Sequence, residues 1–168
     1  MSQGRIGLEK IYLKDLSFES PKSPDVFRNN WKPSIEMDIN TRSRSLFGQG
    51  AREEARQEEE PLFEVVLTVT LKASNDEGEV VLLVEVQQGG IFRIEDFPPE
   101  VIQKVTATVC PNILFPYVRE LIDSVAIRGG FPALHIAPVN FDGIYMEAMR
   151  KAKESAEQNA ATDQDPPH

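Results

Sequence analysis

The stretch LFEVVLTVTLKASNDEGEVVLLVEVQQ, residues 62–88, decides the fold class of this 168-residue chain. In its first half every second residue from Phe63 to Leu71 is apolar, and Glu64 and Lys72 lie on the opposite parity. This period of two is typical of a β-strand with one buried face. The turn-forming residues SNDEGE then lead into a second strand. Neither parity of that second strand is fully polar, which predicts that both of its faces contact protein.

Two further strands are predicted before this stretch. Residues 10–19, KIYLKDLSFE, form a strand that stops at the prolines of PKSP. Residues 31–40, WKPSIEMDIN, alternate strictly, and Pro33 donates no amide, so this strand lies at a sheet edge or begins there. Residues 41–61 lack an apolar period and end in glutamates, which predicts a mobile insertion loop. Pairing is expected to break at Gly89 and Gly90, where a positive φ is anticipated.

The second half of the chain changes to a helical period. The segment FPPEVIQKVTATVC begins with prolines and a glutamate that suit a first helical turn. The following CPNILFPYVRELIDSVAIRGG has apolar residues at helical spacing and ends in two glycines, which favour a helix stop. The crossover FPALHIAPVNF leads to a last helix. The buried stripe of that last helix is expected to contain Phe141, Ile144, Tyr145, Ala148, Met149 and Ala152.

Strands first and helices second indicate an α+β fold, with an antiparallel sheet and helices gathered on one side. The length suits a single domain, which we expect to cover residues 10–153. Residues 1–9 are expected to be a flexible N-terminus, and the polar residues 154–168 are expected to be a disordered tail.

Composition excludes several classes of function. The chain has 27 acidic and 18 basic residues and a formal charge of −9, which opposes nucleic-acid binding and suits docking of a basic partner. One cysteine cannot staple a fold, and it points to a reducing compartment. The N-terminus has no apolar signal region, and the apolar run at residues 80–84 is far too short to insert in a membrane. We therefore expect a soluble, cytoplasmic protein.

The residues offer little for catalysis. Cys110 and His135 are the one conceivable nucleophile and base, and they leave open a hydrolytic or small-molecule-binding α+β domain. Neither a third orienting residue nor an oxyanion loop accompanies them, and Cys110 stands among apolar residues where a thiol is usually inert. No His/Cys cluster has metal spacing, and no phosphate-binding glycine loop occurs. We expect no enzyme activity, no cofactor and no metal. Apolar residues in irregular segments, such as Trp31, are either packed under the fold or exposed for a partner.

Four strings carry a resemblance to a known family: IYLKDLSFE, EVQQGGIF, CPNILFPYVREL and RGGFPALHIAPVNFD. Together they resemble the SecB family of bacterial protein-export chaperones, over residues 11–149. The resemblance implies a four-stranded antiparallel sheet with two main helices, assembled as a dimer of dimers. It implies a chaperone that holds preproteins unfolded without ATP and passes them to the SecA motor. The chain departs from the family in a longer loop at residues 46–61 and in the FPPEVIQKVTATV segment.

The resemblance also implies site residues. The SecA-docking surface falls on Asp15, Glu19, Leu83 and Glu85. The contact between dimers falls on Val84, Val86 and Gln88. The client-binding groove falls on Trp31, Ile35, Met37, Ile39, Tyr117, Leu134 and Tyr145. A SecB-like chaperone that serves stress or toxin–antitoxin control is the remaining alternative, and the intact acidic pair and LLVEV motif argue against it.

Overall fold

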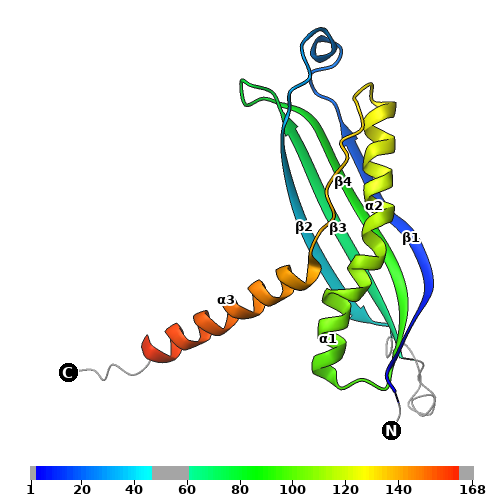
Figure 1. Cartoon of the computed structure of the whole chain (residues 1–168), viewed down its shortest axis with the longest axis vertical. Helices are drawn as coiled ribbons and strands as arrows, with labels where there is room; N and C mark the ends of the chain where they lie inside the picture. The colour runs from blue at the N-terminus through cyan, green and yellow to red at the C-terminus, as the bar shows by residue number, and fades with distance from the viewer. Residues whose placement is uncertain (1–2, 47–60, 163–168) are drawn as a thin grey trace.

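The fold is built on a four-stranded antiparallel sheet in the order β1-β4-β3-β2 (Figure 1). The computed structural model describes residues 3–46 and 61–162. The strands are β1 (Arg5–Glu19), β2 (Ser34–Ser45), β3 (Leu62–Ser74) and β4 (Val80–Glu95). A short 3₁₀ helix, η1 (Asp25–Arg28), lies in the connection between β1 and β2. The predicted strand pair of residues 62–88 therefore forms the centre of the sheet, and β1 and β2 are its edges.

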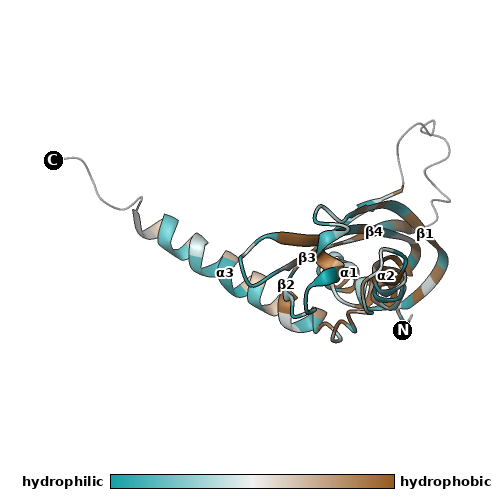
Figure 2. Ribbon diagram, turned by 90° about the horizontal axis from the view of Figure 1, so that it is seen from above, coloured by the Kyte–Doolittle hydropathy of each residue, from teal (hydrophilic) through white to brown (hydrophobic). Residues whose placement is uncertain are grey.

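Two helices cover one face of this sheet, which we call the inner face (Figures 1 and 2). They are α1 (Pro99–Ala107) and α2 (Val109–Arg128), and α2 runs without interruption through Pro116. The predicted stop follows α2, where Gly130 adopts a φ of +89° and the amide of Phe131 bonds to the carbonyl of Ala126 at 2.9 Å. The last helix, α3 (Phe141–Thr162), projects away from the body. The α+β prediction is confirmed.

The core lies between α2 and the inner face of the central strands. One side chain in four along α2 is fully buried, at Cys110, Leu114, Val118, Ile122 and Ala126. This four-residue spacing places them in one row on the helix, against the alternate apolar residues of β3 and β4. Each large apolar side chain buried in this way contributes about 1.5–3 kcal/mol. The contact between α2 and the sheet is therefore the main source of the stability of the domain.

Strand β4 continues through Gly89 and Gly90, where a break in pairing was predicted. Both glycines pair with β1 on one side and with β3 on the other, and neither has a positive φ. Their function is to leave space. A Cβ atom at Gly89 would lie 2.4 Å from the ring of Tyr12, and one at Gly90 would lie 2.6 Å from the ring of Phe92. Neighbouring side chains cover both faces of the sheet at this point, so no side chain fits at positions 89 and 90 of β4.

The domain limits also differ from those predicted. Strand β1 begins at Arg5, so residues 5–9 are paired strand and not a flexible end, and Arg5 forms an ion pair of 3.3 Å with Glu95. Strand β2 continues to Ser45, so the first residues of the expected insertion loop are strand, and residues 47–60 of that loop lie outside the described residues. Helix α3 extends to Thr162, past the expected start of a disordered tail, and residues 163–168 lie outside the described residues.

The apolar stripe predicted to be buried on α3 is mostly exposed. Phe141 is buried against Phe115, with ring centroids 5.9 Å apart. Ile144 and Met149 each expose nearly half of their surface, and Ala148 is exposed. The physical reason is visible in Figures 1 and 2, where the helix leaves the body soon after it begins. The amphipathic pattern of α3 therefore faces solvent within a single chain.

Candidate binding surfaces

The outer face of the sheet, away from α1 and α2, carries the predicted docking residues. Register pairs Glu19 on β1 with Leu83 on β4, and Ser17 with Glu85. Directly paired residues share a face, and these lie opposite in parity to the buried Val84. Asp15 follows on the same face of β1. The structure thus brings Asp15, Glu19, Leu83 and Glu85 together on an uncovered surface. Glu85 is positioned by Thr70 of β3, whose hydroxyl lies 3.2 Å from its carboxylate.

A second polar cluster on the outer face is centred on Glu64 of β3, whose side chain is only 10% exposed. Tyr12 of β1 lies across Gly89 and donates its hydroxyl to Glu64. Lys14 donates to both carboxylate oxygens at 3.1 and 3.2 Å, and Arg44 of β2 donates from Nε at 2.8 Å. Glu64 therefore links both edge strands across the centre of the sheet. The sequence pattern does not predict this cluster, because Gly89 alone indicates that the Tyr12 side chain passes over β4.

The cluster shifts the pKa values of its two central members. The hydrogen bond from Tyr12, followed by those from Arg44 and Lys14, overcomes the effect of burial and lowers the pKa of Glu64 to about 2. Burial, together with the bond to Glu64, raises the pKa of Tyr12 to about 12. Glu64 is accordingly charged and Tyr12 neutral over the whole physiological range.

The residues predicted for the contact between dimers lie inside the chain. Val84 and Val86 are fully buried, and Gln88 is nearly so, on the inner face beneath α2. Side chains covered by their own helix cannot contact another subunit directly. Their assignment to the contact between dimers stays a prediction, and an influence of these residues on assembly would act through the position of α2.

The predicted groove residues of β2 lie on the inner face at the sheet edge. Ile35, Met37 and Ile39 alternate along the strand and pair with residues of β3 that belong to the core. Because β2 has no neighbour on its other side, these side chains stay accessible, and Ile35 is 45% exposed. Trp31, just before β2, packs with its ring centroid 5.1 Å from that of Phe131. Apolar and aromatic surface therefore continues from β2 towards the start of the crossover.

The crossover, residues 131–140, contributes Leu134 to this surface. Leu134 packs partly buried against the core, while Phe131 and Ile136 on either side of it are buried. The two tyrosines of the predicted set lie on the helices. Tyr117 of α2 is half exposed, and Tyr145 lies in the second turn of α3 with part of its surface buried. The structure thus places the β2 residues at the sheet edge, with Trp31 just before the strand and Leu134 three residues after the ring that Trp31 contacts.

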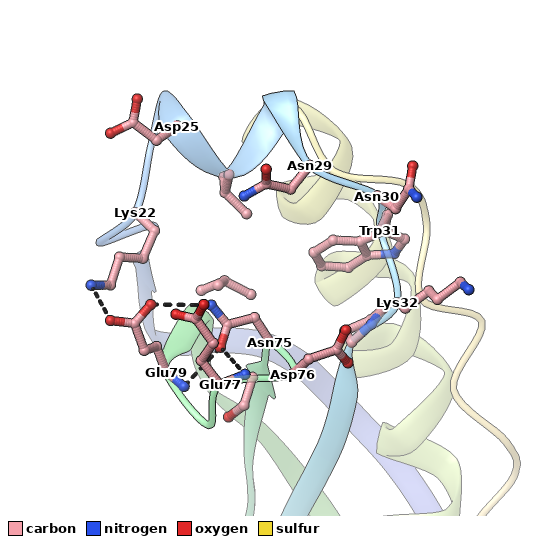
Figure 3. A pocket seen from close by; sticks show the side chains of 14 residues that line it. Lys22, Asp25, Asn29, Asn30, Trp31, Lys32, Asn75, Asp76, Glu77 and Glu79 are labelled. Carbon is pink, nitrogen blue, oxygen red and sulfur yellow. Dashed lines mark hydrogen bonds and ion pairs between the residues drawn. The ribbon is translucent and has the colours of Figure 1, made fainter.

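A cavity of about 400 Å³ lies at one end of the sheet (Figure 3). It opens between the β1–β2 connection and the β3–β4 turn, and Trp31 of the predicted groove lines it. Most of its other lining residues are polar or charged, and among them Lys22 pairs with Glu79 at 2.8 Å and Asn75 donates to the same carboxylate at 3.1 Å. The cavity is therefore a polar continuation of the apolar surface, and the sequence pattern did not predict it.

The thiol and imidazole of the hydrolase alternative are poorly placed for chemistry. Cys110 is fully buried in the core, and burial raises the pKa of its thiol to about 12. A thiol that stays protonated at neutral pH is a weak nucleophile. His135 has an 82% exposed side chain whose Nδ1 lies 3.9 Å from a carboxylate oxygen of Asp123.

Across residues 3–46 and 61–162, no helix is long and apolar enough to cross a membrane.

An α+β fold that leaves one sheet edge apolar and accessible, and the outer sheet face charged, defines a protein that works by binding other chains. The sequence profile described as preprotein translocase subunit SecB matches residues 1–152. A protein-export protein SecB of Pseudomonas paraeruginosa is 44% identical over 155 residues, which are 92% of this chain and 88% of that protein. Another, from Pseudomonas syringae pv. tomato, is 44% identical over 153 residues, 91% of this chain and 85% of that one.

The chain therefore belongs to the SecB family of export chaperones, as its motifs predicted. A solved structure has the same fold: a SecB-like chaperone of Mycobacterium tuberculosis in complex with a peptide from the antitoxin HigA1. It aligns with a TM-score of 0.62 at 16% identity, over 81% of this chain and 91% of that chain.

Proposed function

We propose that this chain is an ATP-independent chaperone that holds preproteins unfolded in the cytoplasm and delivers them to SecA for Sec-dependent translocation. The observation that carries this proposal is the accessible apolar edge of β2, beside Trp31 and Leu134, in a member of an export-chaperone family. Aromatic side chains and a flexible methionine accept many apolar sequences without a strict demand on shape. Folded proteins hide such sequences and are not bound.

The magnitudes favour several binding surfaces acting together. Burial of three large apolar side chains of a client contributes roughly 5–9 kcal/mol, and ordering of the client consumes several kcal/mol of that. One surface alone should therefore bind a short segment no better than about micromolar. We propose a homotetramer, a dimer of dimers, in which later contacts become intramolecular and raise affinity by roughly 10²–10⁴-fold. Exposed apolar residues on edge strand β1, at Ile6, Leu8 and Leu13, support assembly.

A substitution on β2 tests client holding. We expect Ile35→Asp to reduce the ability of the protein to suppress aggregation of reduced lysozyme, measured by light scattering, because a charge at the sheet edge opposes apolar clients. Ile127→Asp is the matched control, since Ile127 at the end of α2 is 58% exposed and lies outside the predicted groove. Equal suppression by Ile35→Asp and wild type would contradict the assignment of the groove.

Docking to SecA is proposed to use the acidic outer face. We expect Glu19→Lys with Glu85→Lys to abolish binding of the basic, zinc-bearing C-terminal tail of SecA, measured by titration calorimetry, and to leave client holding intact. Opposite charges steer such encounters, and reversed charges repel. Glu120→Lys with Glu157→Lys, on α2 and α3, makes the same change in net charge elsewhere. Undiminished affinity of the outer-face variant for the tail would refute this docking site.

A further inference from the structure

The crossover has no regular secondary structure, yet one side chain of α2 fixes its path. Asp123 Oδ1 accepts hydrogen bonds from the backbone amides of Leu134 at 2.8 Å and His135 at 3.1 Å. Between the helix stop at Phe131 and the start of α3, these are the hydrogen bonds that the described structure gives the crossover amides. The Asp123 side chain is 24% exposed, so solvent competes only weakly for its carboxylate.

These two hydrogen bonds hold a backbone conformation that the residue itself disfavours. His135 has a φ of +49°, in the left-handed region that side chains other than glycine rarely adopt. A carboxylate that accepts from two consecutive amides stabilises this bend, because hydrogen bonds to an ionised group are stronger than those between neutral groups. The bend lies between two buried anchors, Phe131 and Ile136. Leu134 lies at the bend itself, so its position depends on Asp123.

We propose that Asp123 is a positioning residue for client binding: it pins the crossover bend and thereby holds Leu134 in the wall of the groove. This inference rests on the proposed holding function and adds a residue that has no client contact of its own. A crossover released from Asp123 stays attached at Phe131 and Ile136, so the fold persists while the groove wall moves. Client affinity then falls, because the wall must be ordered each time a client binds. Most of such a change in affinity is expected in the dissociation rate.

The test compares Asp123→Ala with Asp123→Asn in the full chain. The probe is reduced, carboxymethylated ribonuclease A, which stays unfolded, and its dissociation rate is measured by surface plasmon resonance. Asp123→Ala removes the acceptor, and we expect dissociation about 10-fold faster, with faster hydrogen exchange at the amides of Leu134 and His135 and unchanged exchange in α2. Asp123→Asn keeps an acceptor oxygen in the same place, and we expect it to stay within about 3-fold of wild type.

Two controls separate the hydrogen bonds of Asp123 to the crossover from a general loss of charge on α2 and from a role of the His135 imidazole. Glu120→Ala removes an exposed carboxylate from the same helix and should behave as wild type. His135→Asn removes the imidazole but keeps both amides and tolerates the left-handed region, so it should bind within about twofold of wild type. If Asp123→Ala fails to fold, Asp123→Glu displaces the carboxylate by one methylene group and should give an intermediate acceleration.

Two results would overturn the proposal. One is faster hydrogen exchange at Leu134 and His135 in Asp123→Ala with unchanged client dissociation, which would show that Asp123 holds the crossover bend without influence on the groove. The other is equal acceleration of client dissociation by Asp123→Asn and Asp123→Ala with unchanged exchange at Leu134 and His135 in Asp123→Asn, which would assign the effect to the charge of Asp123 acting on the client and not to the bend. Failure of the wild type to hold the probe would instead sink the proposed function, and the exchange data would still report whether Asp123 pins the bend.

Discussion

At the scale of single residues, the carboxylate of Glu64 joins the two edge strands of the sheet, because Tyr12 and Lys14 of β1 and Arg44 of β2 all donate to it. Its bond to Tyr12 joins positions 52 apart in sequence, across a strand that has no side chain at Gly89. No local pattern reports such a crossing, because the period of a strand gives the face of a residue and not its neighbours two strands away.

The Glu64 cluster predicts a pH-dependent effect of Tyr12→Phe. Folding lowers the pKa of Glu64 from 4.5 to about 2, so the carboxylate stabilises the fold above the unfolded pKa, and this contribution is lost as pH falls from 4.5 towards 2. Removal of the donor should reduce the free energy of unfolding by about 1–3 kcal/mol at pH 7 and by less at pH 3. Urea unfolding at both pH values measures this.

Tyr117→Phe is the control for that measurement, since Tyr117 is half exposed on α2. It should change the free energy of unfolding by less than about 0.5 kcal/mol at either pH. A loss in Tyr12→Phe that is as large at pH 3 as at pH 7 would show that the hydroxyl does not act through the charge of Glu64.

At the scale of elements, the sequence predicts correctly those strands and helices whose apolar periodic face is the face buried in the core. Both central strands and α2 were found, because their periodic apolar faces are the ones that the core covers. The first residues of β1, Arg5 to Glu9, have no buried face. They form a strand because they pair with β4, and such pairing produces no pattern in the local sequence. For α3 the sequence predicted burial that the structure does not show. An amphipathic stripe indicates which face of a helix suits burial, but it does not indicate whether the same chain covers that face.

The glycines of the sheet allow a matched comparison. We expect Gly89→Ala to destabilise the fold by about 1–3 kcal/mol, because the new methyl group would overlap the ring of Tyr12. Gly7→Ala on β1 is the control: its Cβ would lie 3.8 Å from Cβ of Arg93, and alanine is slightly favoured over glycine in a strand. Urea unfolding of both variants measures the difference.

A second substitution identifies the cause. In a Tyr12→Ala background the ring is absent, so Gly89→Ala should cost much less than in the wild type. An unchanged cost there would mean that the backbone of β4, and not the Tyr12 ring, demands glycine at this position.

At the scale of the whole molecule, one chain leaves a large share of its apolar side chains uncovered. Six of them lie on β1 and α3, at Ile6, Leu8, Leu13, Ile144, Met146 and Met149. Apolar side chains exposed together on one element, as on β1 and again on α3, favour association with another chain. We expect the mass in solution, measured by light scattering after gel filtration, to be near four times 18.9 kDa. A mass of one chain at all concentrations would contradict the tetramer.

Edge strand β1 should be needed for that assembly. Leu8→Lys with Leu13→Lys places charges on the exposed edge, and we expect a smaller assembly together with client affinity weakened by roughly 10²-fold or more as multivalency is lost. Ile127→Lys changes an apolar residue on α2 that is more exposed than Leu8 and Leu13, and it should keep the full mass. Retention of the full mass by the double variant would move the interface away from β1.

The division of the sheet into two faces has a consequence for cargo transfer. The groove residues of β2 point to the side covered by the helices, whereas the carboxylates of β1 and β4 point to the other side. With the proposed docking site on the outer face and the proposed groove on the inner face, a loaded chaperone would keep its docking acids vacant, and a ternary complex of cargo, chaperone and motor would be sterically open. We infer that handover would then proceed without eviction at a shared site, by capture of stretches of cargo as they detach.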